Sequence, residues 1–152
     1  MGVCKKDGYK MKKDVLIEIK GVYRQDGQED QVELLTEGSF YKRNGHYYIA
    51  YDESEATGFE GTHTVLKVED SDKVTLIRSG GTHSQLIIQR GVRHQCHYDT
   101  GAGSMTIGIS GDLVESRLTD QGGSLEFSYS LDINTLLASE NRVSIRVREQ
   151  PC

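Results

Sequence analysis

The sequence predicts an all-β fold, a single antiparallel up-and-down β-barrel of about 8–11 strands. Three observations support this prediction. Apolar and polar residues alternate with a period of two along most of the chain, and glycine-containing turn sequences separate the alternating segments. The 152 residues also include 17 glycines but one proline, which suits a fold with many tight turns and paired strands.

The alternation is clearest near the C-terminus and recurs at the start. In residues 124–134 the apolar Leu125, Phe127 and Tyr129 alternate with polar neighbours. Asp26-Gly27 and Asn44-Gly45 are typical of two-residue hairpin turns. The predicted strands are 14–24, 28–40, 46–53, 62–70, 73–79, 84–91, 94–100, 104–110, 113–119, 124–134 and 142–149.

The connections between these strands are short, which favours a closed barrel over a Greek-key sandwich. Strands joined by short loops are neighbours in space, and closure of such a meander removes its exposed edges. A capping-type Asn134 followed by a short apolar run predicts one helical turn over residues 134–139. Residues 1–10 are predicted to be a disordered extension, and residues 11–152 form one barrel domain.

The charge and cysteine content limit the classes of partner and compartment. A net charge of −5 disfavours nucleic acid as a partner, because phosphate binding needs clustered Lys and Arg. The polar start of the chain lacks a secretory pattern, and no apolar run is long enough for a membrane helix. The three scattered cysteines predict no disulfide framework. We therefore expect a cytoplasmic protein without a membrane or nucleic-acid partner.

Several short segments carry the chain's resemblance to a known family. They are Thr36-Glu37-Gly38, Tyr51-Asp52-Glu53-Ser54, Gly61-Thr62 with Thr64, Arg78-Ser79-Gly80, and Tyr98-Asp99-Thr100 with Gly103. In this order and spacing, from Val15 to about Val147, the chain resembles the bacterial YwiB-like proteins. The resemblance implies a calycin-like, or lipocalin-like, barrel and no defined activity. The chain departs from the family pattern at Gly101-Ala102, where the family has a proline and an aromatic residue.

No motif in the sequence indicates an enzyme, a metal site or a cofactor. His94, Cys96 and His97 lie on one predicted strand, so they cannot converge on one ion. Gly101-Ala102-Gly103 leads into a strand, whereas a phosphate-binding loop leads into a helix. The acids Glu53 and Glu55 are expected to be solvated residues at a strand end. We expect no catalytic residues, no metal and no cofactor.

Arg78 carries the sharpest functional hypothesis. It shares strand parity with Val74 and Leu76, which would point it into the barrel. A buried guanidinium needs a partner, either internal groups or a ligand carboxylate or phosphate. The candidate internal partners are Glu37 and the hydroxyls of Tyr98 and Thr100. The opposite parity would place Thr75 and Ile77 inside instead.

Two functions are favoured by these residues, and the sequence does not separate them; an enzyme on the same scaffold is a third alternative, for which the sequence nominates no residues. In the first, the barrel holds a small apolar or anionic ligand near Arg78. The candidate ligand-binding residues are Arg78, Tyr98, Thr100, Glu37 and Tyr51, the last from an aromatic hairpin around Asn44-Gly45. In the second, the interior is packed solid and the outer surface docks another protein or a second copy, as in a homodimer.

Overall fold

The structure is a closed antiparallel barrel of ten strands, which confirms the predicted fold class. The computed structural model describes residues 12–55, 60–70, 72–81, 83–99 and 103–150, so the predicted extension and Thr100 lie outside the described residues. Each strand pairs with its neighbours in sequence, and β1 pairs with β10 to close the wall. The strands are β1 (Lys13–Gln25), β2 (Gln28–Arg43), β3 (His46–Asp52), β4 (Thr62–Glu69), β5 (Lys73–Gly80), β6 (Ser84–Gln89), β7 (Arg93–Asp99), β8 (Ser104–Thr119), β9 (Gly122–Ile133) and β10 (Leu136–Glu149).

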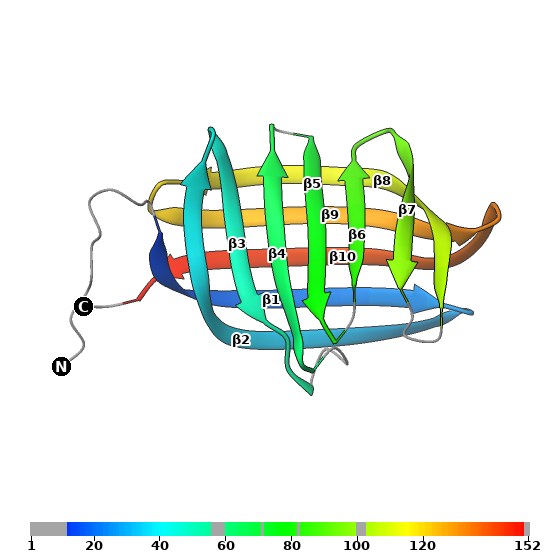
Figure 1. Cartoon of the computed structure of the whole chain (residues 1–152), viewed down its shortest axis with the longest axis horizontal. Coiled ribbons are helices and arrows are strands. Elements are labelled where there is room, and N and C mark those ends of the chain that lie inside the picture. The colour runs from blue at the N-terminus through cyan, green and yellow to red at the C-terminus, as the bar shows by residue number, and fades with distance from the viewer. Residues whose placement is uncertain (1–11, 56–59, 71, 82, 100–102, 151–152) are drawn as a thin grey trace.

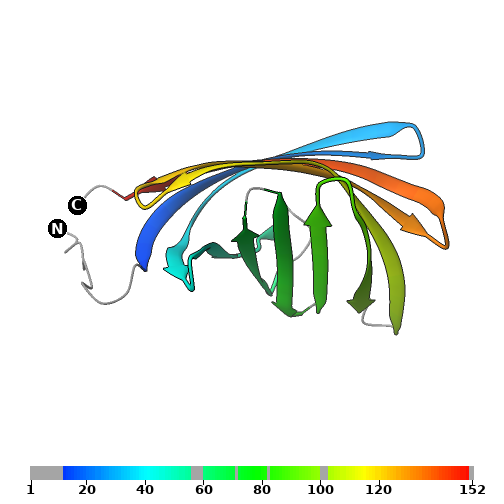
Figure 2. The same cartoon turned by 90° about the horizontal axis from the view of Figure 1, so that it is seen from above.

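The barrel is flattened into two layers whose strands cross. The long strands β1, β2, β8, β9 and β10 form one layer, and the short strands β3–β7 cross them at a steep angle (Figure 1). Viewed from above, the short strands lie on one side of the long layer (Figure 2). Strands β2 and β8 turn from one layer into the other and so form its corners (Figure 1).

Two glycines allow these corners because a side chain would not fit there. A Cβ on Gly38 of β2 would lie 2.3 Å from the carbonyl oxygen of Ala50 and 2.5 Å from Cδ1 of Ile17. A Cβ on Gly111 of β8 would lie 2.2 Å from the carbonyl oxygen of Gln89. The register of β8 against β9 shifts between Gly111 and Leu113, which marks a bulge. Bulges bend a strand, and this one lets β8 continue as one strand where two were predicted.

The predicted helical turn over residues 134–139 is wrong. Asn134 and Thr135 both have positive φ, 52° and 68°, and form the two-residue turn of a hairpin. Leu136 and Leu137 then begin β10. The capping-type asparagine thus serves a turn, because asparagine tolerates the left-handed conformation.

The core lies between the two layers and consists of inward-facing apolar side chains from all ten strands. Among its fully buried members are Ile17, Phe40, Ile49, Leu66, Ile88, Ile109, Leu125 and Phe127. The alternation predicted from the sequence is visible in the burial of β4, β6 and β9, where buried and more exposed residues alternate. No helix long and apolar enough to cross a membrane occurs among the described residues.

Candidate functional site

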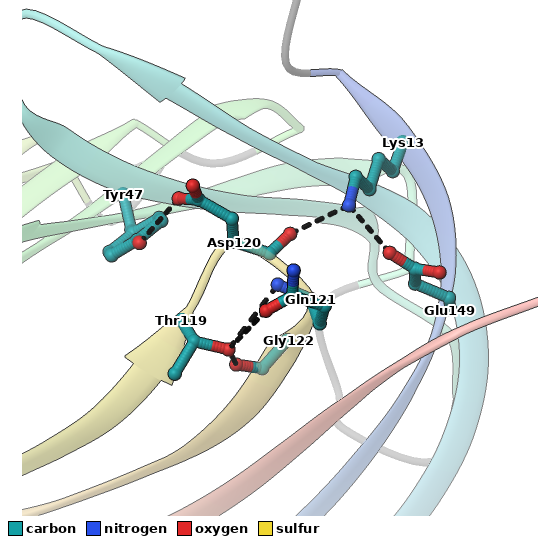
Figure 3. Close-up of polar contacts among 7 residues, drawn as sticks. All are labelled: Lys13, Tyr47, Thr119, Asp120, Gln121, Gly122 and Glu149. Carbon is teal, nitrogen blue, oxygen red and sulfur yellow. Dashed lines mark hydrogen bonds and ion pairs between the residues drawn. The ribbon is translucent and has the colours of Figure 1, made fainter. Parts of the chain in front are cut away.

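One end of the barrel is closed by polar contacts, one of which joins the two layers. The hydroxyl of Tyr47 on β3 donates a hydrogen bond of 2.7 Å to Oδ1 of Asp120, in the turn between β8 and β9 (Figure 3). Nζ of Lys13 on β1 donates to the carbonyl oxygen of Asp120 at 2.7 Å and pairs with Oε1 of Glu149 at 2.5 Å. We call this group of residues, Lys13, Tyr47, Asp120 and Glu149, the closed end.

The opposite end of β3 begins a line of inward-facing polar residues. Tyr51 lies four residues after Tyr47, or about 13 Å along the strand. In register, Tyr51 pairs with Thr64, Thr64 with Arg78, Arg78 with Ser84, and Ser84 with Tyr98. These five residues, one on each of β3–β7, are called the polar row.

The polar row borders the apolar core. The next inward-facing residues of β3–β6 are Ile49, Leu66, Leu76 and Leu86, which are all buried. Within the row, Tyr51, Thr64 and Ser84 are buried, whereas Arg78 and Tyr98 are half-buried. The polar row thus lies directly beside the apolar core on these strands.

The alternative parity of β5, with Thr75 and Ile77 pointing into the barrel, does not agree with the burial of its residues. Thr64 and Ser84, which flank Arg78, are 0% and 7% exposed, and Val74 and Leu76 on the same face are buried as well. Thr75 is also buried, but Ile77 is only half-buried and Ser79 is exposed. Arg78 thus shares the inward face.

Glu53 is the acidic residue of this end, and the expectation that it is a solvated strand-end residue is wrong. Its exposed fraction is 7%, whereas Glu55 is exposed as expected. The backbone N–H of Glu53 donates to the carbonyl oxygen of Thr62 at 2.9 Å, which extends the β3–β4 ladder by one residue. Because Glu53 follows Tyr51 by two positions, its side chain stays on the inward face.

Two tyrosines of the long layer lie on its inward face and are affected by the charge of Arg78. Tyr23 lies on β1 and Tyr129 on β9, and the positive charge of Arg78 acts on both hydroxyls. Burial raises the pKa of Tyr129 to about 12, and Arg78 partly offsets this rise. Burial also raises the pKa of Tyr23, while Arg78 lowers it and Glu53 raises it. The Arg78 guanidinium and the Glu53 carboxylate therefore shift the pKa of the Tyr23 hydroxyl in opposite directions.

Tyr51 interacts with both Glu53 and Arg78. Burial raises the pKa of Tyr51 far above its usual range, the Glu53 charge and the hydrogen bond that Tyr51 donates to Glu53 raise it further, and Arg78 lowers it. Tyr51 is thus a neutral hydroxyl that donates to the carboxylate. We call Glu53, Thr62, Tyr23 and Tyr129, together with the polar row, the polar end.

Several buried polar atoms at the polar end lack hydrogen-bond partners. They are Oε1 of Glu53 and the hydroxyl oxygens of Thr62, Thr64 and Ser84, which have none in the described part of the protein. An unsatisfied buried polar atom costs about 1–3 kcal/mol. Four such atoms beside one another are unusual for a region that serves only to pack the barrel.

The structure brings together some of the sequence-predicted site residues but not all of them. Arg78, Tyr98 and Tyr51 lie in the polar row. Glu37 does not belong to the site: it is exposed on the outer face of β2, because its neighbour Gly38 pairs with inward-facing Val15 and Tyr51. Thr100 lies outside the described residues.

Sequence reasoning missed Glu53, Tyr23 and Tyr129 as members of the site. Strand parity was the available signal for Glu53, since it shares the face of Tyr51. Tyr23 and Tyr129 come from the other layer, so their approach to Arg78 depends on how the layers cross, which sequence periodicity does not encode. Gly21 makes room for Tyr23, because a Cβ there would lie 2.7 Å from the tyrosine hydroxyl.

The His94–His97 segment does not gather ligands. Cys96 is buried, with its Sγ accepting the backbone N–H of Ile87 at 3.4 Å, and His97 is exposed. Nε2 of His94 lies 2.9 Å from Oε1 of Gln89. Within the described ranges, no three His, Cys, Asp or Glu side chains are grouped to hold a metal ion.

Comparison with known proteins places the chain in a family and supports the fold. The chain is 23% identical over 124 residues to "Uncharacterized beta-barrel protein YwiB" of Bacillus subtilis, covering 82% of this chain and 85% of that protein. The crystal structure of the ywiB protein from Bacillus subtilis superimposes with a TM-score of 0.81 and 19% identity, over 93% of this chain and 94% of the other. These matches confirm the resemblance to YwiB-like proteins. Residues 17–145 match the family model described as "Domain of unknown function (DUF1934)", and the chain belongs to this family of β-barrel proteins.

Proposed function

We propose that the barrel binds a small anionic ligand at the polar end, with Arg78 as the anchor for its carboxylate or phosphate. The observation that carries this proposal is the position of Arg78. It lies half-buried at the centre of the polar row, between Thr64 and Ser84, with tyrosines on both sides and on the opposite layer. A guanidinium binds such oxyanions through two parallel hydrogen bonds.

The surroundings of Arg78 suit a small ligand with an apolar body. The hydroxyls of Thr64 and Ser84, which have no partner in the described ranges, lie directly beside Arg78 on the neighbouring strands and can bond to ligand oxygens. The core residues Leu66, Leu76 and Leu86 continue from the row and can contact an apolar group. Binding sites of this kind combine an apolar lining with a few convergent polar groups.

Native mass spectrometry of the protein purified from its own host tests the proposal. The wild-type chain should carry a bound small molecule, and Arg78→Gln should lose it. Arg142→Gln is the matched control, since Arg142 is an exposed arginine that pairs with Glu126 on the outer face. Retention of the bound mass in Arg78→Gln, or its absence from wild type under gentle conditions, would refute the proposal.

A second candidate function is self-association through the tip of the β9–β10 hairpin. Leu136 and Leu137 are 75% and 63% exposed, and Ile133 beside them is 38% exposed. Figure 1 shows this hairpin extending past the short strands at the right of the view. Exposed apolar clusters mark contact surfaces more often than isolated residues do. The same mass spectra would show a dimer that Leu136→Ser with Leu137→Ser abolishes, or a monomer that excludes it.

A further inference from the structure

A buried carboxylate lies close to the anion anchor of the polar end. Glu53 is 7% exposed, and its carboxylate accepts a hydrogen bond from the hydroxyl of Tyr51. Its other carboxylate oxygen, Oε1, has no partner there. A buried carboxylate accepts several hydrogen bonds when it is stably ionised, so Oε1 can accept a further one from a ligand.

Glu53 lines a hollow of about 230 Å³ between the ends of β3, β4 and β5. Its other lining residues are Asp52, Gly61, Thr62, His63, Ser79 and Gly80. Thr62 is 2% exposed, and its hydroxyl oxygen is a second buried atom at this hollow with no partner in the described ranges. The hollow thus presents two buried oxygen atoms that can accept hydrogen bonds, of which the Thr62 hydroxyl can also donate one.

Among the residues that the structure describes, no lysine or arginine lines this hollow, so neither type supplies a charged donor to its oxygen atoms there. The basic residue in its described lining is His63, whose Nδ1 lies 2.8 Å from Oδ1 of Asp52. His63 is therefore already engaged by an exposed carboxylate outside the barrel wall. Gly61 and Gly80 contribute no side chains, and a Cβ on Gly80 would lie 2.8 Å from the carbonyl oxygen of Gly61.

The charges of the polar end also disfavour a ligand that is only anionic. Glu53 follows Tyr51 by two residues on the inward face, and Arg78 lies two strands from Tyr51 in register through Thr64. The two charges also shift the pKa of Tyr51 and Tyr23 in opposite directions. An anion held by Arg78 would be repelled by the Glu53 carboxylate, in a region where burial strengthens the interaction. A ligand that also carries an ammonium group would replace this repulsion by an attraction.

We propose that the ligand of the polar end is zwitterionic and amino-acid-like: Arg78 binds its carboxylate, and Glu53 with Thr62 accepts hydrogen bonds from its ammonium group. This inference rests on the proposed function and narrows it to one class of molecule. The apolar residues beyond the polar row would contact the ligand's side chain. The charge arrangement thereby discriminates against simple carboxylic acids, because these bring a negative charge near Glu53 and no donor for its Oε1.

Three matched probes separate the two charges, and isothermal titration calorimetry measures their binding to the full chain. Phenylalanine carries both charges, 3-phenylpropionate lacks the ammonium group, and 2-phenylethylamine lacks the carboxylate. We expect phenylalanine to bind about tenfold or more tightly than 3-phenylpropionate, as for a charge-assisted hydrogen bond. We expect 2-phenylethylamine to bind more weakly than phenylalanine, because it has no group for Arg78.

Two isosteric variants test whether Glu53 causes the preference for phenylalanine over 3-phenylpropionate. Glu53→Gln should make phenylalanine and 3-phenylpropionate bind with similar affinity, whereas Glu55→Gln, which changes an exposed acid on the same strand end, should keep the preference. The wild-type comparison stands even if Glu53→Gln does not fold. Equal binding of the two probes to wild type, both dependent on Arg78, would overturn this inference and leave the proposed function intact. Binding independent of Arg78 would overturn the proposed function as well, and binding of none of the probes would overturn the zwitterion inference.

Discussion

The hydroxyl of Tyr47 lies 2.7 Å from Oδ1 of Asp120, 73 residues further along the chain. This hydrogen bond joins β3 of the short layer to the turn between β8 and β9 of the long layer (Figure 3). It closes the end of the barrel opposite the polar end. The two ends of the barrel thus differ. Direct polar contacts connect the strands at the closed end, whereas the polar end contains buried polar atoms that lack partners among the described residues.

Removal of the Tyr47 hydroxyl should loosen the closed end without affecting the polar end. Tyr47→Phe loses one hydrogen bond to a carboxylate, and we expect the free energy of unfolding to fall by about 1–2 kcal/mol. Urea denaturation measures the change. Tyr41→Phe is the control, because Tyr41 lies on the outer face with its ring stacked on Tyr48, and it should change stability little. Equal losses in both variants would contradict the role given to the Tyr47–Asp120 bond.

The corner of β2 at Gly38 should not tolerate a methyl group. Gly38→Ala would place Cβ against the Ala50 carbonyl and Ile17, so we expect a loss of about 1–3 kcal/mol or more in the free energy of unfolding. Gly81→Ala meets its nearest neighbour at an ordinary 3.5 Å and should be nearly neutral. Thermal unfolding of the two variants side by side checks this. A stable Gly38→Ala would show that the layers do not pack as closely here as described.

Stability should fall at high pH because of Tyr129. Its folded-state pKa of about 12 lies above the usual value of 10, so the folded state favours the neutral phenol. This contribution is fully present below pH 10 and is lost as the pH rises through 12, by about 3 kcal/mol in total. Denaturation curves between pH 9 and pH 12 measure it. Tyr129→Phe should make the fall shallower without removing it, because the raised pKa values of Tyr51 and Tyr23 act in the same direction. An unchanged slope in that variant would contradict the prediction.

The charges of Arg78 and Glu53 should be coupled in stability. Arg78→Gln leaves the buried carboxylate without its neighbouring cation, so we expect the double variant Arg78→Gln with Glu53→Gln to be more stable than the sum of the single changes by about 1–3 kcal/mol. A double-mutant cycle by urea denaturation measures this coupling. Strict additivity would show that the two groups do not share one environment.

The fold could be predicted from the sequence because burial alternates residue by residue. Leu125, Phe127 and Tyr129 were placed on one face by parity alone, and the structure buries all three. For Arg78 the same rule leaves two faces open, and the burial of its neighbours places it on the inward one. Glu37 is predicted as a partner of Arg78 without a parity argument, and its neighbour Gly38 occupies the inward position because only a glycine fits the corner.

The remaining errors arise where strand ends and turns decide the structure. Glu53 follows the last residue of β3, and its burial depends on a backbone hydrogen bond to Thr62 that no local pattern reveals. Asn134 can begin a helix or form a hairpin turn, and the pairing of β9 with β10 selects the turn. Tyr23 and Tyr129 reach the site across the barrel, which requires the crossing of the layers to be known.

An NMR titration with 3-phenylpropionate, as the simplest anionic probe with an apolar body, tests the location of the site most directly. If the polar end binds anions, the backbone amide shifts of Tyr51, Thr64, Arg78, Ser84 and Tyr98 should change together and saturate, while those near Tyr47 and Asp120 at the closed end stay constant. Arg78→Gln should abolish these changes. Saturable shifts confined instead to the closed end or to the hairpin tip at Leu136 would contradict a binding site at the polar end.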